Sequence, residues 1–218
     1  MEGYALEDLS ASEVDRLAAL HAPLAQAVRA LAEATIRTEV DDAEIQAVTA
    51  EVETLAARLR VQQLPNSFGV RLAPDGQRSR AWGNAVVGLR NPIAPPLVMT
   101  RDPEGRAWSD FTLGAAYEGP PGLVHGGVSA LILDQVLGEA AGAGGKPGMT
   151  GTLTVRYRRG TRLGPLHAEA HIDRVEGYKT YVVGTISDDE GVTVEAEAVF
   201  ILPRWAREEL ARRQERFE

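Results

Sequence analysis

The stretch that decides the fold is YEGPPGLVHGGVSALILDQVLGEA, residues 117–140. It opens as a Gly/Pro-rich turn and continues as a helix whose apolar residues run round most of its circumference, so we expect a helix that is buried on nearly every side. One carboxylate, Asp134, lies near the middle of this helix. A charge in such a place is costly unless it has partners or a chemical task. Asp134 is therefore either a residue that reaches solvent through a gap or a functional group.

The turn before the helix favours a functional role for Asp134. Residues 125–127 read HGG, which places two residues without side chains at a helix N-terminus. Free backbone N–H groups and the helix dipole favour a developing negative charge at that position. Glycines before a helix are also common for structural reasons. A carboxylate together with a backbone oxyanion site is nevertheless the minimum needed for attack on an acyl carbonyl.

Alternating apolar and polar residues on both sides of this helix predict strands. RAWGNAVVGLR at residues 80–90 is predicted as a strand, and residues 97–113 are predicted as a hairpin with an Asp-Pro-Glu-Gly turn. Four strands follow the helix, and in the last of them one face is expected to carry Val192, Val194, Ala196, Ala198 and Phe200. The predicted fold class is α+β, with one helix at residues 126–142 against one face of an antiparallel sheet.

The first third of the chain has a different period. Apolar residues three or four positions apart predict two amphipathic helices, which Ser10 with Glu13 and Asp41 with Glu44 would cap. The expected domains are a helical extension at residues 1–66, a main domain at 67–203 and a charged helical tail at 204–218. Because two such helices cannot bury both apolar stripes alone, they are expected to pack on the main domain or on a second subunit.

Composition excludes several classes of function. A net charge of −8 over 218 residues disfavours a nucleic-acid or anionic-membrane partner. The absence of cysteine excludes disulfides, thiolate metal sites and a thiol nucleophile. His167 and His171 would lie about 13 Å apart on a strand, too far to share one metal ion, so no metal site is expected. An acidic N-terminus and the lack of a long apolar run predict a cytoplasmic protein with no membrane partner.

Two segments, GPPGLVHGGVSALILDQVLG and GMTGTLTVRYRR, resemble the hotdog-fold acyl-CoA thioesterases. They are most similar to the PaaI-like branch, in which HGG is followed by an Asp nine residues after the His. The resemblance covers about residues 80–202 and leaves the N-terminal helices outside it. It implies an antiparallel sheet wrapped around a central helix, a homodimer, an acyl-CoA substrate and no cofactor apart from the coenzyme A of that substrate.

The resemblance also implies roles for individual residues. Gly126 would donate its N–H to the thioester oxygen, His125 would be a catalytic residue that helps to shape that pocket, and Gly127 would bind the substrate. Asp134 would be the nucleophile or the base that activates water, and Thr150 would orient that carboxylate or the water. The remaining implied contacts are to the coenzyme A phosphates, from Arg158 and Arg159.

Each role has a structural alternative: His125 as a cap, Thr150 as an ordinary strand residue and the arginines as a solvated edge. Ser129 belongs to no Gly-x-Ser-x-Gly elbow, which disfavours a serine hydrolase.

Geometry adds one expectation about the assembly. Eight residues of helix separate Gly126 from Asp134 by about 12 Å, which is too far for one carbonyl to touch both. If both groups serve one reaction, each active site must combine residues of two subunits. Acyl chain length, and whether dimers assemble into tetramers, stay open. Two other functions also stay open, a non-catalytic acyl-CoA binder and a hotdog hydratase or dehydratase.

Overall fold

The computed structural model describes residues 4–73, 79–95 and 97–207. The chain divides into two compact units, the N-terminal unit at Met1–Ala94 and the C-terminal unit at Pro95–Glu218. The boundary between the units, at residues 94 and 95, lies further along the chain than the boundary after residue 66 that the change from helical to strand periodicity suggests.

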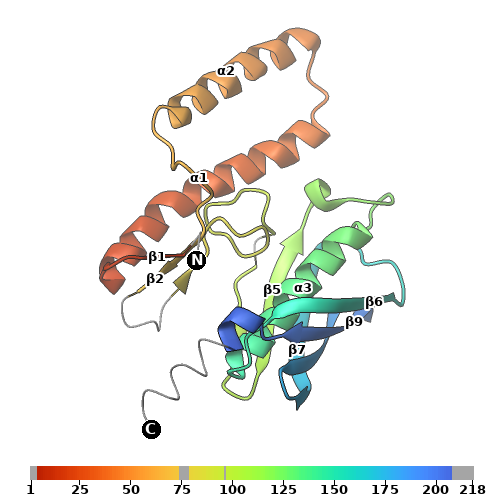
Figure 1. Cartoon of the computed structure of the whole chain (residues 1–218). Helices are drawn as coiled ribbons and strands as arrows, with labels where there is room; N and C mark the ends of the chain where they lie inside the picture. The colour runs from red at the N-terminus through yellow and green to blue at the C-terminus, as the bar shows by residue number, and fades with distance from the viewer. Residues whose placement is uncertain (1–3, 74–78, 96, 208–218) are drawn as a thin grey trace. The chain divides into compact units, whose positions relative to one another are not determined.

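The N-terminal unit contains the two predicted helices, α1 at Ala11–Arg37 and α2 at Asp42–Arg60 (Figure 1). Ser10 and Glu13 form the predicted capping box, in which the Ser10 side chain accepts from the Glu13 N–H and the Glu13 carboxylate accepts from the Ser10 N–H. Asp41 caps α2 in the same position by accepting from the Glu44 N–H at 3.0 Å. Both helix starts were thus predictable from short-range sequence.

A small sheet completes the N-terminal unit. Strand β1, Tyr4–Leu6, runs parallel to β2, Val70–Leu72, which pairs antiparallel with β3, Ser79–Arg80. The predicted strand at residues 80–90 is wrong, because the chain forms successive turns after Arg80. The Asn84 side chain accepts from the N–H groups of Val86 and Val87, and these local bonds replace a strand ladder.

The C-terminal unit contains a six-stranded antiparallel sheet with the order β4-β5-β7-β8-β9-β6. Its strands are β4 Thr100–Arg101, β5 Arg106–Leu113, β6 Met149–Tyr157, β7 Gly164–Glu176, β8 Lys179–Asp188 and β9 Gly191–Ile201. A short 3-10 helix, η1, covers Ala115–Tyr117, and the central helix α3 covers Gly126–Ala143. The predicted hairpin at residues 97–113 is present as β4 and β5.

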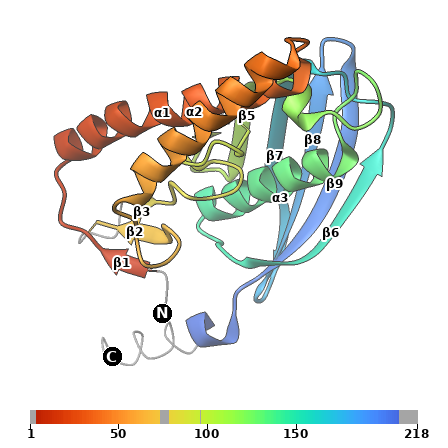
Figure 2. The same ribbon diagram turned by 90° about the horizontal axis from the view of Figure 1, so that it is seen from above.

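Helix α3 lies across the concave face of this sheet, as Figure 2 shows for β7, β8, β9 and β6. The largest buried side chains belong to α3 and to the strand positions that face it, and Ile132, Leu133, Val136 and Leu137 are fully buried. An antiparallel sheet wrapped around one apolar helix, with a helical N-terminal extension, is a hotdog fold. The fold class that the sequence predicts is confirmed.

Two details of the C-terminal unit differ from the predictions. Helix α3 is not buried on every side in the single chain, because Leu131 is 41% exposed and Gly127 is also exposed. In β9 the predicted inward face is correct from Val194 onward but wrong at Val192, which is exposed while Thr193 is buried. The β8–β9 register shifts at this point, which exchanges the two faces of the strand.

Of the predicted helical tail, residues 204–207 are helical and residues 208–218 lie outside the described residues. Among the described helices none is both long and apolar enough to cross a membrane.

Candidate active site

The loop before α3 holds the HGG turn in place. Gly119 lies so close to His125 that a Cβ at Gly119 would be 2.7 Å from the His125 Cα. Gly122 has a φ of +74°, which favours glycine, and its N–H donates to the Glu118 carboxylate at 2.6 Å. The GPPG loop is therefore compact, because Gly119 allows the close approach to His125 and Gly122 adopts a positive φ. This loop leads into α3 and positions His125 at its start.

His125 is the N-cap residue of α3. Its Nδ1 accepts from the Gly127 N–H at 3.0 Å, so the proton of the neutral ring is on Nε2. A Cβ at Gly127 would be 3.1 Å from that same Nδ1, which explains the second glycine. The Gly127 N–H is thus already engaged within the turn. This arrangement does not favour the Gly127 N–H as a donor to a substrate.

Gly126 is the first residue of α3, and its N–H has no acceptor in the part of the chain that the structure describes. The next two N–H groups are occupied, because the Gly127 N–H donates to His125 Nδ1 and the Val128 N–H donates to the His125 carbonyl. The Gly126 carbonyl accepts from the Tyr157 hydroxyl at 2.8 Å. The turn therefore offers a single, fixed N–H at the positive end of the helix dipole.

Asp134 lies two turns further along α3, and Thr150 of β6 meets it. The Thr150 hydroxyl donates to Asp134 Oδ1 at 2.7 Å. A β-bulge at Gly151, between the paired residues Thr150 and Thr152, shifts the register of β6 directly after this contact. Bulges often re-aim a side chain beside a site, and this one lies next to the residue that holds the carboxylate.

Asp134 and the Gly126 N–H are about 12 Å apart along α3, since eight residues separate them at about 1.5 Å each. Both lie near Gly127 and Leu131, two residues of α3 that are exposed in the single chain, and the neighbouring strand β6 is an edge strand with most of its residues exposed. Leu131 on α3, Met149 at the start of β6 and Tyr157 at its end are exposed apolar side chains along this border. Asp134 and the free Gly126 N–H therefore lie beside an open surface of the single chain.

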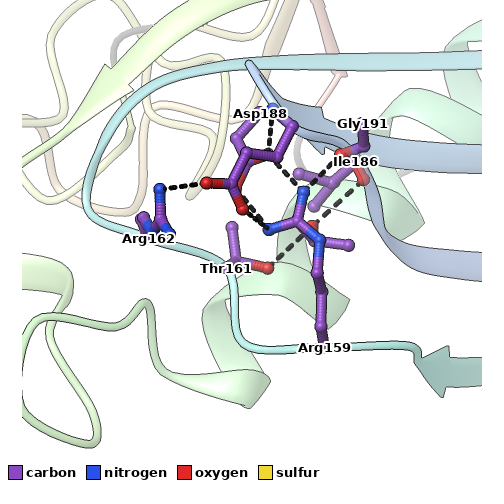
Figure 3. Close-up of polar contacts among 8 residues, drawn as sticks. Arg159, Thr161, Arg162, Ile186, Asp188 and Gly191 are labelled. Atoms are coloured by element: carbon purple, nitrogen blue, oxygen red, sulfur yellow. Dashed lines mark hydrogen bonds and ion pairs between the residues drawn. The ribbon is translucent and has the colours of Figure 1, made fainter.

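The two arginines after β6 differ in their partners. Arg158 is 54% exposed and donates to Glu195 of β9 at 2.6 Å. Arg159 forms a two-pronged ion pair with Asp188 at the β8–β9 turn, with one bond at 2.8 Å, and it also donates to the Gly191 carbonyl at 2.9 Å (Figure 3). This arrangement does not favour Arg159 as a phosphate ligand, because three of its five N–H donors already bind Asp188 and Gly191.

The cluster around Arg159 is a structural clamp. The Asp188 side chain is only 4% exposed, and the guanidinium of Arg159 lowers the pKa of that carboxyl to about 2. Beneath it, the Thr161 hydroxyl donates to Thr193 at 2.8 Å, and Thr193 donates to the Ile186 carbonyl (Figure 3). These bonds attach the loop after β6 to the β8–β9 turn. Val124 donates to the Thr161 carbonyl at 2.8 Å, which connects the clamp to the residue before His125.

Tyr157 is the site residue that sequence reasoning missed. The alternating pattern placed it with Leu153 and Val155 as an apolar residue of β6, and nothing in that pattern pointed to its hydroxyl. The available signal was its position in the sequence, directly before Arg158 and in the same strand as Thr150. Among the described residues no group of three His, Asp or Glu side chains could hold a metal ion.

Comparisons with known proteins bear on the family of the chain. Residues 121–195, which include the HGG turn, Asp134 and Thr150, match the family model of the thioesterase superfamily. The chain is 36% identical over 96 residues to acyl-coenzyme A thioesterase THEM4 of Xenopus laevis, a match that covers 42% of each protein. It is 35% identical over 101 residues to THEM4 of Mus musculus, covering 45% of this chain and 44% of the relative. The chain thus spans less than half the length of these two relatives.

A solved structure extends the likeness to nearly the whole chain. The crystal structure of a thioesterase superfamily protein superimposes with a TM-score of 0.73 and 33% sequence identity, covering 91% of this chain and 94% of that one. Coverage this wide includes part of the N-terminal unit. A hotdog unit with these motifs, matched over almost its full length by a relative of this identity, settles the family. The chain belongs to the thioesterase superfamily.

Proposed function

We propose that the chain hydrolyses an acyl-CoA thioester to a free acid and coenzyme A. The observation that carries this proposal is the 2.7 Å hydrogen bond from Thr150 to Asp134, on the helix whose first N–H, at Gly126, is free among the described residues. A held carboxylate and an unoccupied backbone donor are the two groups that thioester hydrolysis requires. The two THEM4 relatives, which are named acyl-coenzyme A thioesterases, support the same reaction.

In the proposed reaction the thioester carbonyl oxygen accepts from the Gly126 N–H. Asp134 takes a proton from a water molecule, whose oxygen attacks the carbonyl carbon, or it attacks that carbon itself and forms an anhydride that water then opens. The tetrahedral intermediate collapses, the carbon–sulfur bond breaks, and the thiolate of coenzyme A leaves and takes up a proton. The Gly126 hydrogen bond strengthens as the oxyanion forms, and such a donor is typically worth about 3 kcal/mol in the transition state.

Thr150 supports this chemistry by holding one of the two carboxylate oxygens of Asp134. Because a thiolate is a good leaving group, an aspartate is a sufficient base or nucleophile, and the chain needs no cysteine for the reaction. His125 acts by capping α3 and shaping the pocket, in line with its bond to the Gly127 N–H. The spacing of HGG and Asp134 supports assignment to the PaaI-like branch.

We further propose that the enzyme is a homodimer with two composite sites, in which Gly126 of one chain and Asp134 of the other serve one substrate. The separation of about 12 Å within one chain requires this if both groups act on the same carbonyl. The exposed residues of α3 and the free edge of β6 support this proposal, because Gly126 and Asp134 lie beside a surface that a second copy can cover. A cytoplasmic location stays a prediction.

The test is the turnover of Asp134→Asn with short, medium, long and aromatic acyl-CoAs, measured with a thiol-trapping reagent. The absence of cysteine from the chain removes background labelling from this assay. The amide keeps the shape of the carboxylate but cannot act as base or anionic nucleophile, so we expect hydrolysis to be lost. Circular dichroism and native mass confirm that the variant is folded and assembled. Retention of more than about a tenth of wild-type turnover would show that Asp134 is not the reacting group.

A further inference from the structure

Helix α2 carries an apolar stripe that nothing in its own unit buries. Its apolar residues recur at alternating steps of three and four, which is the a/d pattern of a coiled-coil seam. All five are exposed, and no residue of α2 is buried in the part of the chain that the structure describes. The stripe consists of Ile45, Val48, Val52, Leu55 and Leu59. The stripe is therefore an apolar surface that no described residue of the N-terminal unit buries.

Two different faces of helix α1 make contacts within the N-terminal unit. One face packs on the turns after β3, and another faces α2. Ala25 is buried and the His21 ring lies 6.4 Å from the Trp82 ring, so the first face meets the turns after β3. Leu20 and Leu24, on another face of α1, are exposed. Between α1 and α2 runs an apolar groove of about 500 Å³. Its apolar lining includes Leu31, Val40 and the first three residues of the α2 stripe, Ile45, Val48 and Val52.

The charges along α2 indicate what fills this groove. Glu44 and Glu53 line it, which disfavours an anionic occupant such as a fatty acid or coenzyme A. The acidic residues of α2 all precede residue 54, and its two basic residues, Arg58 and Arg60, are at the end. If a second α2 packs in the antiparallel direction, the acidic N-terminal part of each helix lies opposite the basic C-terminus of the other. The two helix dipoles are then antiparallel, which is favourable. A parallel arrangement would place like charges together.

We propose that the apolar groove between α1 and α2 is an interface with the same hairpin of a second copy, in which two α2 helices pair antiparallel about a two-fold axis at Val52. In this register Ile45 packs beside Leu59 of the partner subunit, and Glu44 lies near Arg60 of the partner subunit. Each helix then covers the other's seam and half of the groove. The interface is independent of the proposed hydrolysis, because none of its residues belongs to the candidate active site.

Single-cysteine variants test the register directly, since the natural chain has no cysteine. Under mild oxidation, Val52→Cys should form a disulfide-linked dimer, because the two-fold axis brings both copies of residue 52 together. Ala50→Cys is the matched control, two residues away on the opposite, exposed face of α2. Ile45→Cys and Leu59→Cys should not cross-link alone but should do so when mixed. Covalent dimers are counted on denaturing gels without reductant.

Native mass spectrometry provides a second test that needs no cross-link. The α2 pair would join two of the proposed dimers into a tetramer. Val52→Glu places two like charges on the proposed axis and should therefore halve the native mass, whereas Ala50→Glu should leave it unchanged. Two results would overturn the proposal: no more covalent dimer from Val52→Cys than from Ala50→Cys, or an unchanged native mass for Val52→Glu. Cross-linking of Ile45→Cys with itself would overturn the antiparallel register. Loss of turnover in Asp134→Asn with an intact cross-link separates this interface from the proposed chemistry.

Discussion

The hydroxyl of Tyr157, at the end of the edge strand β6, donates to the carbonyl of Gly126, at the first residue of α3. A Cβ at Gly126 would lie 3.3 Å from the same hydroxyl, so ring and turn are in close contact. The bond fixes the peptide that follows the proposed oxyanion donor. Tyr157 is therefore a positioning residue for Gly126.

Tyr157→Phe removes this hydrogen bond and keeps the ring in place. If the bond fixes the donor N–H, kcat should fall by about tenfold with little change in KM, since the interaction matters most when the oxyanion forms. Steady-state kinetics with one good acyl-CoA substrate measure both constants. Tyr4→Phe, in the N-terminal unit, serves as the control. An unchanged kcat would mean that the turn holds its geometry without Tyr157.

Thr150 offers a pair of closely matched variants. Thr150→Val keeps the branched shape and loses the hydroxyl that holds Asp134, whereas Thr150→Ser keeps the hydroxyl. We expect the valine variant to lose roughly ten- to a hundredfold in kcat and the serine variant to stay within a few-fold of wild type. Equal activity of the two variants would return Thr150 to the role of an ordinary strand residue.

Mixed dimers test the composite site. Gly126→Pro removes the donor N–H at the first helical position, where proline is well tolerated, and His125 already has the extended conformation that precedes proline. Random association of this variant with Asp134→Asn makes half of the dimers mixed, each with one intact site, so roughly a quarter of wild-type activity should return.

Gly126→Ala, which keeps the N–H, is the control for the added side chain, and native mass must first show that the proline variant dimerises. Verified mixed dimers without any activity would contradict a site shared between two chains.

The two arginines should respond differently to truncation. Arg158→Ala should raise KM for an acyl-CoA more than for an acyl thioester without the nucleotide, if its exposed guanidinium exchanges Glu195 for a phosphate. Arg159→Ala should instead lower the free energy of unfolding, because it leaves the buried Asp188 carboxylate without its partner. Chemical denaturation and kinetics of both variants decide the matter. A nucleotide-dependent KM effect at Arg159 alone would reverse the assignment.

Asp188 makes the stability of the clamp depend on pH. Its pKa is lowered from 3.8 to about 2 by Arg159, so the folded state favours the ionised carboxylate. The stabilisation is fully present above about pH 4 and is lost as the pH falls toward 2. Asp188→Asn should therefore be less stable than wild type at pH 6, and the difference should shrink as the pH falls below 4. Denaturant titrations at several pH values measure this, with the exposed neighbour Asp189→Asn as control. A difference that is constant with pH would exclude the charge of Asp188 as its cause.

Local signals in the sequence were sufficient for the helices, the hairpin and the sheet of the C-terminal unit. Capping residues such as Ser10 act within three positions. The alternation in β7, in β8 and in β9 from Val194 onward reports directly which face is buried. The strand predicted at residues 80–90 failed because the side chain of Asn84 accepts from the backbone N–H groups of Val86 and Val87, a choice that alternation does not reveal.

The candidate site was predictable where it depends on residue type and spacing, as for Asp134 in its apolar helix. What could not be predicted depends on contacts between distant segments. Arg159 pairs with Asp188, twenty-nine positions later, and Tyr157 meets Gly126, thirty-one positions earlier. Such contacts exist only once the sheet has assembled. A glycine inside the strand, Gly151, was the one local sign of the bulge beside Thr150.

The position of β6 at the end of the six-stranded sheet also affects how the protein must be handled in solution. An edge strand leaves one row of its backbone N–H and C=O groups open, and such a row is a template for irregular association with other chains. Residues of β6 therefore have two tasks. Thr150 holds Asp134, and the strand as a whole must not pair with other chains and aggregate. Substitutions that expose the edge should first lower the yield of soluble protein, before any effect on turnover can be measured.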